Sequence, residues 1–260
     1  MTSITRDRPM EIDDSLFFQD PIPDPGSLQV MVGPEALHAC KSRRLAVGES
    51  LYLTDGKGKV ALARIEDRSP RCDSLTVMIE ETVVNPMPSP RLVLASAIPK
   101  GDRQSVMLGM AVQLGMNDYI PLECDRSAVQ YSDRMSHRWR KVILESMKQC
   151  RQTHMPAIRN ARTLEHLLDA SGELVAKRSR VLVVGDPQGD CAGVDDCADW
   201  ARLEEMILIV GPEGGFSSAE KQLLDSEKVL KLRLSDQILR TETAAISLCA
   251  AAYQYFFAKR

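Results

Sequence analysis

Three prolines stand at alternate positions within Asn85-Pro86-Met87-Pro88-Ser89-Pro90. Proline fixes its own φ, lacks a backbone N–H, and pushes the residue before it into an extended conformation. Neither a helix nor a central strand can therefore cross this segment. We take residues 85–90 as a linker and expect a separate domain on each side of it.

Before the linker, residues 16–84 contain short runs with the alternation typical of strands. These runs are 28–32, 51–54, 60–65 and 75–79. Asp55-Gly56-Lys57-Gly58 supplies turn residues between two of them, and a helix is expected from Pro34 to about Leu45. The pattern predicts a small β-barrel. Residues 1–15 carry many charges and few apolar side chains, so we expect a flexible extension.

After the linker, residues 91–260 contain apolar runs that alternate with helical periodicity. The runs are 92–95, 119–122, 181–185, 207–210 and 230–234, and helices are expected near 102–115 and 132–150. Apolar runs bounded by glycine and proline are typical of parallel strands that are buried on both faces. This part of the chain therefore predicts an α/β domain.

Composition excludes several classes of protein. The seven cysteines form no Cys-x-x-Cys pair, so neither a disulfide framework nor a zinc ribbon is indicated. The four histidines share no ligand-like spacing with cysteines or carboxylates, and we expect no metal. No apolar run is long enough to cross a bilayer, and no secretory signal is present. These features predict a cytoplasmic protein without a membrane partner.

Basic residues are concentrated in one stretch, although the net charge of the chain is −3. Residues 134–162 carry eight lysines and arginines. At roughly 100° per residue, the helix expected at 132–150 turns apolar residues to one side and Arg134, Arg138, Lys141 and Lys148 to the other. This basic face fits either a solvated surface or a contact with the phosphate backbone of a nucleic acid.

A glycine loop follows the strand expected at 207–210. It reads Gly211-Pro212-Glu213-Gly214-Gly215-Phe216, and Ser217-Ser218-Ala219-Glu220 then has the pattern of a capping box. Its glycines let a ligand approach the backbone closely, at the edge where α/β sheets bind ligands. The spacing matches neither a dinucleotide fingerprint nor a P-loop. Taken alone, the loop could also be a purely structural turn.

A second strand, polar loop and helix follow at residues 230–252. The helix is rich in alanine, and we expect Thr241 or Thr243 to cap it, with its free N–H groups directed at the loop. Arg240 and Glu242, which flank Thr241, fit either an ordinary surface ion pair or part of a site.

Together, Ile-Val-Gly-Pro-Glu-Gly-Gly-Phe-Ser (209–217) and Ile-Leu-Arg-Thr-Glu-Thr-Ala (238–244) resemble the signature of the bacterial 16S ribosomal RNA uridine-N3 methyltransferases of the SPOUT superfamily. The resemblance implies a PUA-like RNA-binding barrel followed by an α/β domain with a C-terminal trefoil knot, an exception to the general absence of knots. It also implies S-adenosylmethionine as cofactor, a homodimer, and 16S rRNA or the 30S ribosomal subunit as partner.

The same resemblance implies roles for particular residues. Cofactor contacts are expected from Val184, Gly185, Gly211, Pro212, Glu213, Gly214, Gly215, Leu234, Ser235, Ile238, Leu239, Arg240, Thr241 and Thr243. We expect Arg240 to orient the base or a phosphate, and Glu213 or Glu242 to act as general base or to hold that arginine. The sequence does not rank the two carboxylates. RNA contacts are expected from Arg43, Arg44, Arg134, Arg138, Lys141, Lys148 and Arg151.

Departures from the family pattern concentrate on the RNA side. Positions with unusual residues are Ser42, Met110, Gln113, Lys148, Gln152, Asp236 and Gln237. Two hypotheses remain: an active rRNA methyltransferase, or a diverged relative that binds cofactor and RNA without methylating or that acts on another RNA. A phosphate-binding nucleotide enzyme is disfavoured, because no lysine follows the glycine loop.

Overall fold

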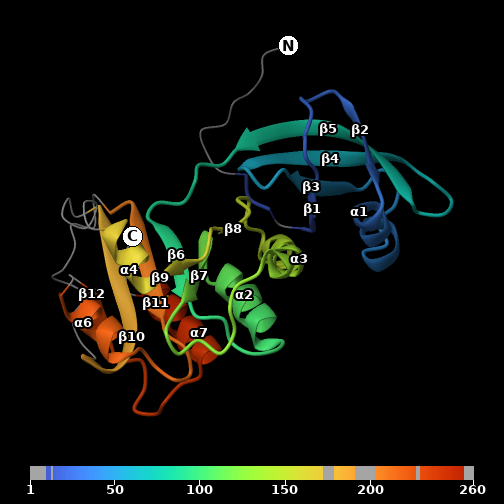
Figure 1. The fold of residues 1–260 in the computed structure, drawn as a ribbon. Helices are drawn as coiled ribbons and strands as arrows, with labels where there is room; N and C mark the ends of the chain where they lie inside the picture. Colours follow the sequence, from blue (N-terminus) through green and yellow to red (C-terminus); the bar gives the residue numbers. More distant parts are fainter. Residues whose placement is uncertain (1–9, 13, 172–178, 191–202, 227–228, 255–260) are drawn as a thin grey trace. The chain divides into compact units, whose positions relative to one another are not determined.

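The computed structural model describes residues 10–12, 14–171, 179–190, 203–226 and 229–254, and the chain divides into two compact units (Figure 1). The first unit comprises Met1–Met87 and Met147–Met155, and the second comprises Pro88–Ser146 and Pro156–Arg260. The expected extension 1–15 lies largely outside the described residues. Residues 147–155 pack with the first unit, a return of the chain that no sequence pattern predicts.

The first unit is built on a five-stranded sheet in the order β1-β3-β4-β5-β2. Its strands are β1 (Leu16–Phe18), β2 (Leu28–Val32), β3 (Ser50–Thr54), β4 (Lys59–Arg68) and β5 (Ser74–Val84). β1 runs parallel to β3 and the other pairs are antiparallel. The core includes Phe17, Met31 and Ile65, which are fully buried. All four expected strands are present, and only the three-residue β1 was missed.

A short helical segment lies beside this sheet. It consists of α1 (Pro34–Leu37) and a π-helical turn η1 (His38–Ser42), so it ends before the expected Leu45. Glu35 anchors it, because the Phe18 N–H donates to its Oε2 at 3.0 Å. The other oxygen, Oε1, lies 2.6 Å from Lys148 Nζ at the end of helix α3 (Asp133–Cys150).

The second unit contains a parallel sheet in the order β12-β10-β11-β6-β7-β8 (Figure 1). Its strands are β6 (Arg91–Ser96), β7 (Asp118–Glu123), β8 (Ala157–Ile158), β10 (Arg180–Asp190), β11 (Glu205–Val210) and β12 (Val229–Leu232), and β9 (Arg162–Thr163) pairs with β7. Every residue of β11 is buried, as expected for a strand covered on both faces. The α/β fold class is confirmed, while the trefoil knot stays a prediction.

Helices cover both faces of the parallel sheet. They are α2 (Arg103–Gln113), α4 (Leu164–Asp169), α6 (Ser218–Ser226) and α7 (Thr241–Ala252). α7 packs against β6, β10, β11 and α2. Leu164 and Leu167 of α4 and Leu224 of α6 join side chains such as Val93 and Ile207 in a core on the sheet. The alternation of strand and helix thus places the loops after β10, β11 and β12 along one edge.

Five charged residues form a network at the amino edge of this sheet, which we call the amino-edge network. Its members are Arg91, Asp118, Arg159, Arg180 and Glu205. Arg159 Nη2 lies 2.6 Å from Asp118 Oδ2 and 2.7 Å from Glu205 Oε1. Arg91 pairs with Asp118, and Arg180 pairs with Glu205. Buried carboxylates need such partners, because an unpaired buried charge is costly.

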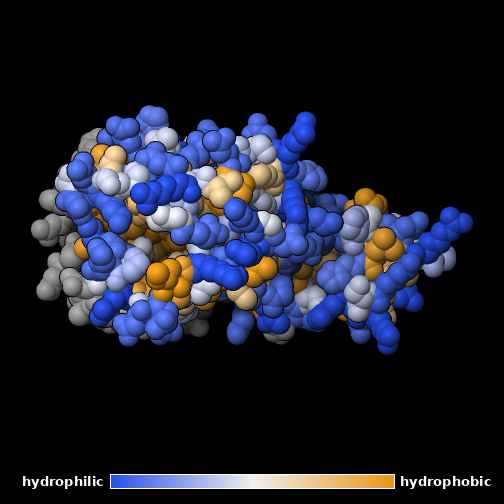
Figure 2. Space-filling view, turned by 60° about the horizontal axis from the view of Figure 1, so that its bottom comes forward, coloured by the Kyte–Doolittle hydropathy of each residue, from blue (hydrophilic) through white to orange (hydrophobic). Residues whose placement is uncertain are grey.

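Hydrophilic residues predominate on the face that Figure 2 shows, with hydrophobic ones in small separated patches. Among the residues that the structure describes, no helix is long and apolar enough to span a membrane. The described part of the chain also contains no cluster of three or more histidines, cysteines and acidic residues that could hold a metal ion.

Candidate active site

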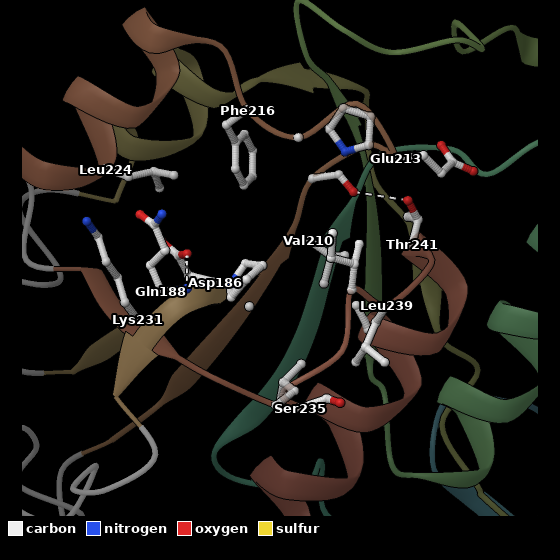
Figure 3. Close-up of a pocket in the computed structure, with 18 of the residues that line it drawn as sticks. Asp186, Gln188, Val210, Glu213, Phe216, Leu224, Lys231, Ser235, Leu239 and Thr241 are labelled. Carbon is white, nitrogen blue, oxygen red and sulfur yellow. Dashed lines mark hydrogen bonds between the residues drawn. The ribbon is translucent and has the colours of Figure 1, made fainter.

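A cavity of about 310 Å³ lies at the carboxyl ends of β10, β11 and β12 (Figure 3). This is the edge at which open α/β sheets bind ligands. Ten of the expected cofactor residues line it: Gly185, Gly211, Pro212, Glu213, Gly215, Leu234, Ser235, Ile238, Leu239 and Thr241. The three loops that the sequence singled out therefore meet around one cavity, although Gly185 and Thr241 lie 56 positions apart in the chain.

Four expected cofactor residues are not part of the cavity lining. Val184 is fully buried within β10, and Gly214 lies against Arg126, whose Nη1 donates to the Gly214 carbonyl at 3.1 Å. Arg240 and Thr243 are exposed. Their contact with a cofactor stays a prediction.

Backbone geometry explains the glycines of the loop at 211–216. Gly215 has φ +67°, a conformation that residues with a side chain rarely adopt, and its N–H donates to the Pro212 carbonyl at 2.8 Å. A Cβ at Gly211 would lie 2.9 Å from the ring of Phe216. The glycine at 211 thus makes room for an aromatic ring that lines the cavity.

The expected capping box opens α6. The Ser217 N–H donates to Glu220 Oε2 at 2.7 Å, and the Glu220 N–H donates to Ser217 Oγ at 3.3 Å. This reciprocal pair satisfies N–H groups that have no partner within the helix. It confirms the capping box and fixes the chain where the glycine loop ends.

The expected cap of α7 is wrong. The helix begins after Arg240, and no side chain caps it. Thr241 already lies in the helix, and its Oγ1 donates to the Gly211 carbonyl at 3.1 Å (Figure 3). Thr243 is exposed. The threonine hydroxyl therefore ties α7 to the glycine loop instead of closing its own helix.

Sequence reasoning missed several groups that line the cavity. Gln188 and Lys231 lie at the end opposite Glu213 and Thr241 (Figure 3). The first part of β10, residues 180–184, pairs with β11. Directly after it, the Gln188 N–H donates to Asp186 Oδ1 at 2.8 Å and closes a turn. Their position in the sequence could have indicated them, because Asp186 and Gln188 directly follow an apolar run, as the glycine loop does.

The two candidate carboxylates differ in position. Glu213 lines the cavity, whereas Glu242, in the first turn of α7, does not. Both face Arg103, the first residue of α2, at 3.7 Å and 3.8 Å respectively. Arg103 was not foreseen, because no local motif marks it.

Two cysteines of the second unit are poorly suited to act as nucleophiles. Burial raises the pKa of the Cys124 thiol far above its ordinary value, and the nearby Glu220 carboxylate raises it further. Burial also raises the pKa of Cys249, in α7, to about 12. Because the thiolate is the reactive form, a covalent cysteine mechanism is disfavoured here.

Six of the expected RNA-binding residues are exposed: Arg43, Arg44, Arg134, Arg138, Lys141 and Arg151. Two of them have acidic partners, since Arg43 pairs with Asp14 at 3.4 Å and Arg138 with Asp102 at 2.6 Å. These pairs are exposed and therefore weak enough to exchange for a phosphate.

The placement of Lys148 on an exposed basic face is wrong. Its side chain is only 6% exposed, and Nζ lies 2.6 Å from Glu35 Oε1. The helical rotation was correct for most of α3, but the last turn packs in the first unit, where Glu35 covers it. A buried and paired ammonium is not available to a phosphate.

Two family descriptions match the chain. An RNA methyltransferase domain matches residues 85–253, and an RNA methyltransferase PUA domain matches residues 33–71. The parallel sheet with its cavity and the smaller β unit thus define the class: an RNA methyltransferase with an N-terminal PUA-like domain.

Known relatives specify the family within this class. The chain is 30% identical over 234 residues to the ribosomal RNA small subunit methyltransferase E of Mycobacterium bovis, covering 88% of this chain and 87% of that protein. It is 31% identical over 208 residues to the protein of that name from Rickettsia conorii, covering 80% and 81%. The chain belongs to the family of ribosomal RNA small subunit methyltransferases E.

Solved structures have the same fold. A ribosomal RNA small subunit methyltransferase E from Neisseria gonorrhoeae, bound to S-adenosylmethionine, superposes with a TM-score of 0.79 at 21% identity, covering 93% of this chain and 98% of that one. A putative methyltransferase from Legionella pneumophila, also in complex with S-adenosylmethionine, has a TM-score of 0.74 at 26% identity, with 94% and 98% covered.

Proposed function

We propose that this protein transfers the methyl group of S-adenosylmethionine to N3 of a uridine in 16S ribosomal RNA. The observation that carries the proposal is the cavity at the carboxyl edge of the parallel sheet, where the glycine loop meets the start of α7. The domain that contains this cavity matches an RNA methyltransferase domain. Thr241 joins these two elements through its bond to the Gly211 carbonyl.

The residues around the cavity fit S-adenosylmethionine. Its volume of about 310 Å³ lies within the range of small-molecule sites. Phe216, Val210 and Leu239 offer apolar surface for an adenine ring, and the glycines leave backbone groups accessible. Asp186 and Lys231, which pairs with Asp225 in the cavity lining, offer charges of both signs, and these suit hydroxyls and the charged methionine end. When bound, this cofactor supplies an electrophilic methyl group on a sulfonium.

The remaining work for the protein is alignment and proton transfer. N3 lies on the Watson–Crick edge of uridine, so the target base must be unpaired when it reacts. Arg240, exposed at the start of α7, is placed to orient the base or a phosphate through its fork of donors. Glu213 or Glu242 accepts the N3 proton.

Exposed basic residues supply affinity for the RNA backbone. In the second unit these are Arg134, Arg138 and Lys141 on α3, and in the first unit Arg43, Arg44 and Arg151. Contacts of this kind are independent of sequence and weaken with salt. The target nucleotide must therefore be selected elsewhere, by the shape of the 30S subunit or by contacts at the base.

We further propose that the protein works in the cytoplasm as a homodimer. Ile238, which lines the cavity, is 90% exposed, and Tyr253 near the end of α7 is 48% exposed. A partner subunit that covered Ile238 would remove a large apolar side chain beside the cavity from water. Sedimentation of the purified protein tests the dimer, and a monomer at micromolar concentration would contradict it.

The test of the function uses purified protein, S-adenosylmethionine and 30S subunits from cells that lack the gene. Mass mapping of the digested 16S rRNA is expected to locate one new methyl group on a uridine base. Cofactor binding by calorimetry without any methylated nucleotide would instead favour the diverged, non-catalytic relative. Methylation of a different RNA would favour a differently targeted enzyme.

A further inference from the structure

Three charged residues from distant parts of the second unit meet beside the cavity. Arg103 begins α2, Glu213 lies in the glycine loop, and Glu242 lies in the first turn of α7. Arg103 Nη1 is 3.7 Å from Glu213 Oε1, and Arg103 Nε is 3.8 Å from Glu242 Oε1. One guanidinium thus bridges the two carboxylates that the sequence could not rank.

Burial separates the roles of the two carboxylates. Glu213 lines the cavity, and its side chain is 34% exposed, so a bound substrate can reach it. Glu242 is only 13% exposed, does not line the cavity, and has a buried Oε2 that finds no hydrogen-bond partner among the described residues. A buried carboxylate depends on a nearby positive charge, and Arg103 supplies it. Glu242 therefore acts on Arg103 rather than on a substrate.

The distances also matter. Separations of 3.7 Å and 3.8 Å fall within ion-pair range but exceed hydrogen-bond length. Arg103 can therefore orient Glu213 electrostatically while the lone pairs of that carboxylate stay available to accept a proton. The amino-edge network differs here, because Asp118 Oδ2 and Glu205 Oε1 accept direct hydrogen bonds of 2.6 Å and 2.7 Å from Arg159.

The position of Glu242 relative to the glycine loop is fixed independently. Its neighbour Thr241 donates to the Gly211 carbonyl at 3.1 Å, two residues before Glu213. α2 packs against α7, which holds Arg103 next to the same turn. The three charges therefore come from two helices that pack together and from a loop that Thr241 ties to one of them.

We propose that Arg103 is a positioning residue, held by Glu242, that sets Glu213 as the general base for the target uridine. This inference rests on the proposed function. In the step, the N3–H bond breaks and its proton passes to the Glu213 carboxylate. The N3 electron pair forms the new bond to the methyl carbon, while the carbon–sulfur bond breaks and leaves its electron pair on sulfur.

The test compares Glu213→Gln, Arg103→Ala, Arg103→Lys and Glu242→Gln in single-turnover methylation of 30S subunits. Glu213→Gln is expected to lower the rate of the chemical step roughly 100- to 10,000-fold, the range for loss of a general base. Arg103→Ala is expected to lower it about 10- to 100-fold through misplacement of the carboxylate. Arg103→Lys recovers part of that loss, because the positive charge remains. Glu242→Gln has a smaller effect in the same direction.

Readouts other than rate separate positioning from a structural role. For the Arg103 and Glu242 variants, we expect the KM for 30S subunits and the calorimetric Kd for S-adenosylmethionine to stay within about twofold of wild type. Glu165→Gln and Arg162→Ala, exposed positions on α4 and β9 of the same unit, serve as matched controls with unchanged rate. The double variant of Arg103→Ala and Glu213→Gln should be no slower than Glu213→Gln alone, because Arg103 acts only through the Glu213 carboxylate.

Three outcomes would overturn the inference. A wild-type rate for Glu213→Gln would show that Glu213 is not the general base. If the rate losses of Arg103→Ala and Glu213→Gln were fully additive in the double variant, Arg103 would act independently of Glu213. Failure of Arg103→Lys to recover any activity, together with weakened cofactor binding, would indicate a structural role. In each case the wild-type enzyme still methylates uridine, so the proposed function stands. Absence of methylation by the wild type would remove both proposals.

Discussion

The two edges of the parallel sheet carry ion pairs of different design. At the amino edge, Arg159 lies within 2.7 Å of the carboxylates of Asp118 and Glu205. At the carboxyl edge, Arg103 stays 3.7–3.8 Å from Glu213 and Glu242. The pairs at the amino edge include direct hydrogen bonds, whereas the pairs at the carboxyl edge are longer than hydrogen bonds. The difference suggests that one edge serves stability and the other chemistry.

The largest effect is expected from Glu205→Gln at the amino edge. This change leaves Arg159 and the largely buried Arg180 without their shared carboxylate. We expect a loss of about 3 kcal/mol in the free energy of unfolding, measured by urea denaturation, because a broken buried pair strands its partner. The neighbouring exposed Glu204→Gln is the matched control and should change stability by less than about 0.5 kcal/mol. Equal effects of the two substitutions would contradict a special role for the network.

Gly211→Val tests the carboxyl edge. Its Cβ would meet the Phe216 ring at 2.9 Å and push the ring into the cavity. Overpacking of this kind costs about 2 kcal/mol, so the Kd for S-adenosylmethionine should rise roughly thirtyfold in calorimetry. An unchanged Kd would show that Phe216 does not help to form the cofactor site. A fall in stability equal to that of Glu205→Gln would erase the contrast between the edges.

Thr241→Val removes one hydrogen bond at the carboxyl edge and keeps the shape of the side chain. Loss of the bond to the Gly211 carbonyl should cost about 1 kcal/mol, seen as a roughly fivefold slower methyl transfer. Thr241→Ser, which keeps the hydroxyl, is the matched control. If Thr241→Ser is slowed as much as Thr241→Val, the hydrogen bond to the Gly211 carbonyl does not account for the effect.

Asp118 gives the smallest effect and a dependence on pH. Burial raises the pKa of this carboxyl above its ordinary 3.8, although Arg159 and Arg91 act to lower it. A group whose pKa is raised by folding contributes its full stability below pH 3.8, and this contribution is lost as pH rises through the folded-state value.

Asp118→Asn cannot ionise, so the advantage of wild type over this variant should be greatest in acid and shrink towards neutral pH. At about pH 7 we expect a difference below about 1 kcal/mol in urea denaturation, because Arg159 keeps its pair with Glu205 and the side chain of Arg91 is 38% exposed. An advantage of wild type that grows as pH rises would reverse the sign and contradict the raised pKa.

Local chemistry made much of the site predictable. The glycine loop, its capping box and the alanine-rich α7 each depend on neighbouring residues, and all three are present. The apolar runs predicted the long strands of the parallel sheet for the same reason. The short elements β1, β8, β9 and α4 were missed, because two to six residues give too little periodicity to detect.

The predictions that were wrong or missing concern residues whose partners lie far away in the sequence. Lys148 and Glu35 are 113 positions apart, so helical rotation alone placed Lys148 on the wrong side. Arg103 pairs with two carboxylates that lie more than a hundred residues further along the chain, and no local sequence motif predicts these contacts. Thr241 was expected to cap its own helix, but its partner is the Gly211 carbonyl, thirty residues away.

The return of residues 147–155 to the first unit has a consequence for how this protein can be taken apart. A fragment ending at Met87 would lack Lys148 and leave Glu35 without its cation. It would also lose His154, whose ring fills the space beside Gly58 that a side chain there would need. No single cut in the polypeptide yields an intact PUA-like unit. A stable fragment of the first unit must therefore carry residues 147–155, which follow most of the second unit's α3 in the chain.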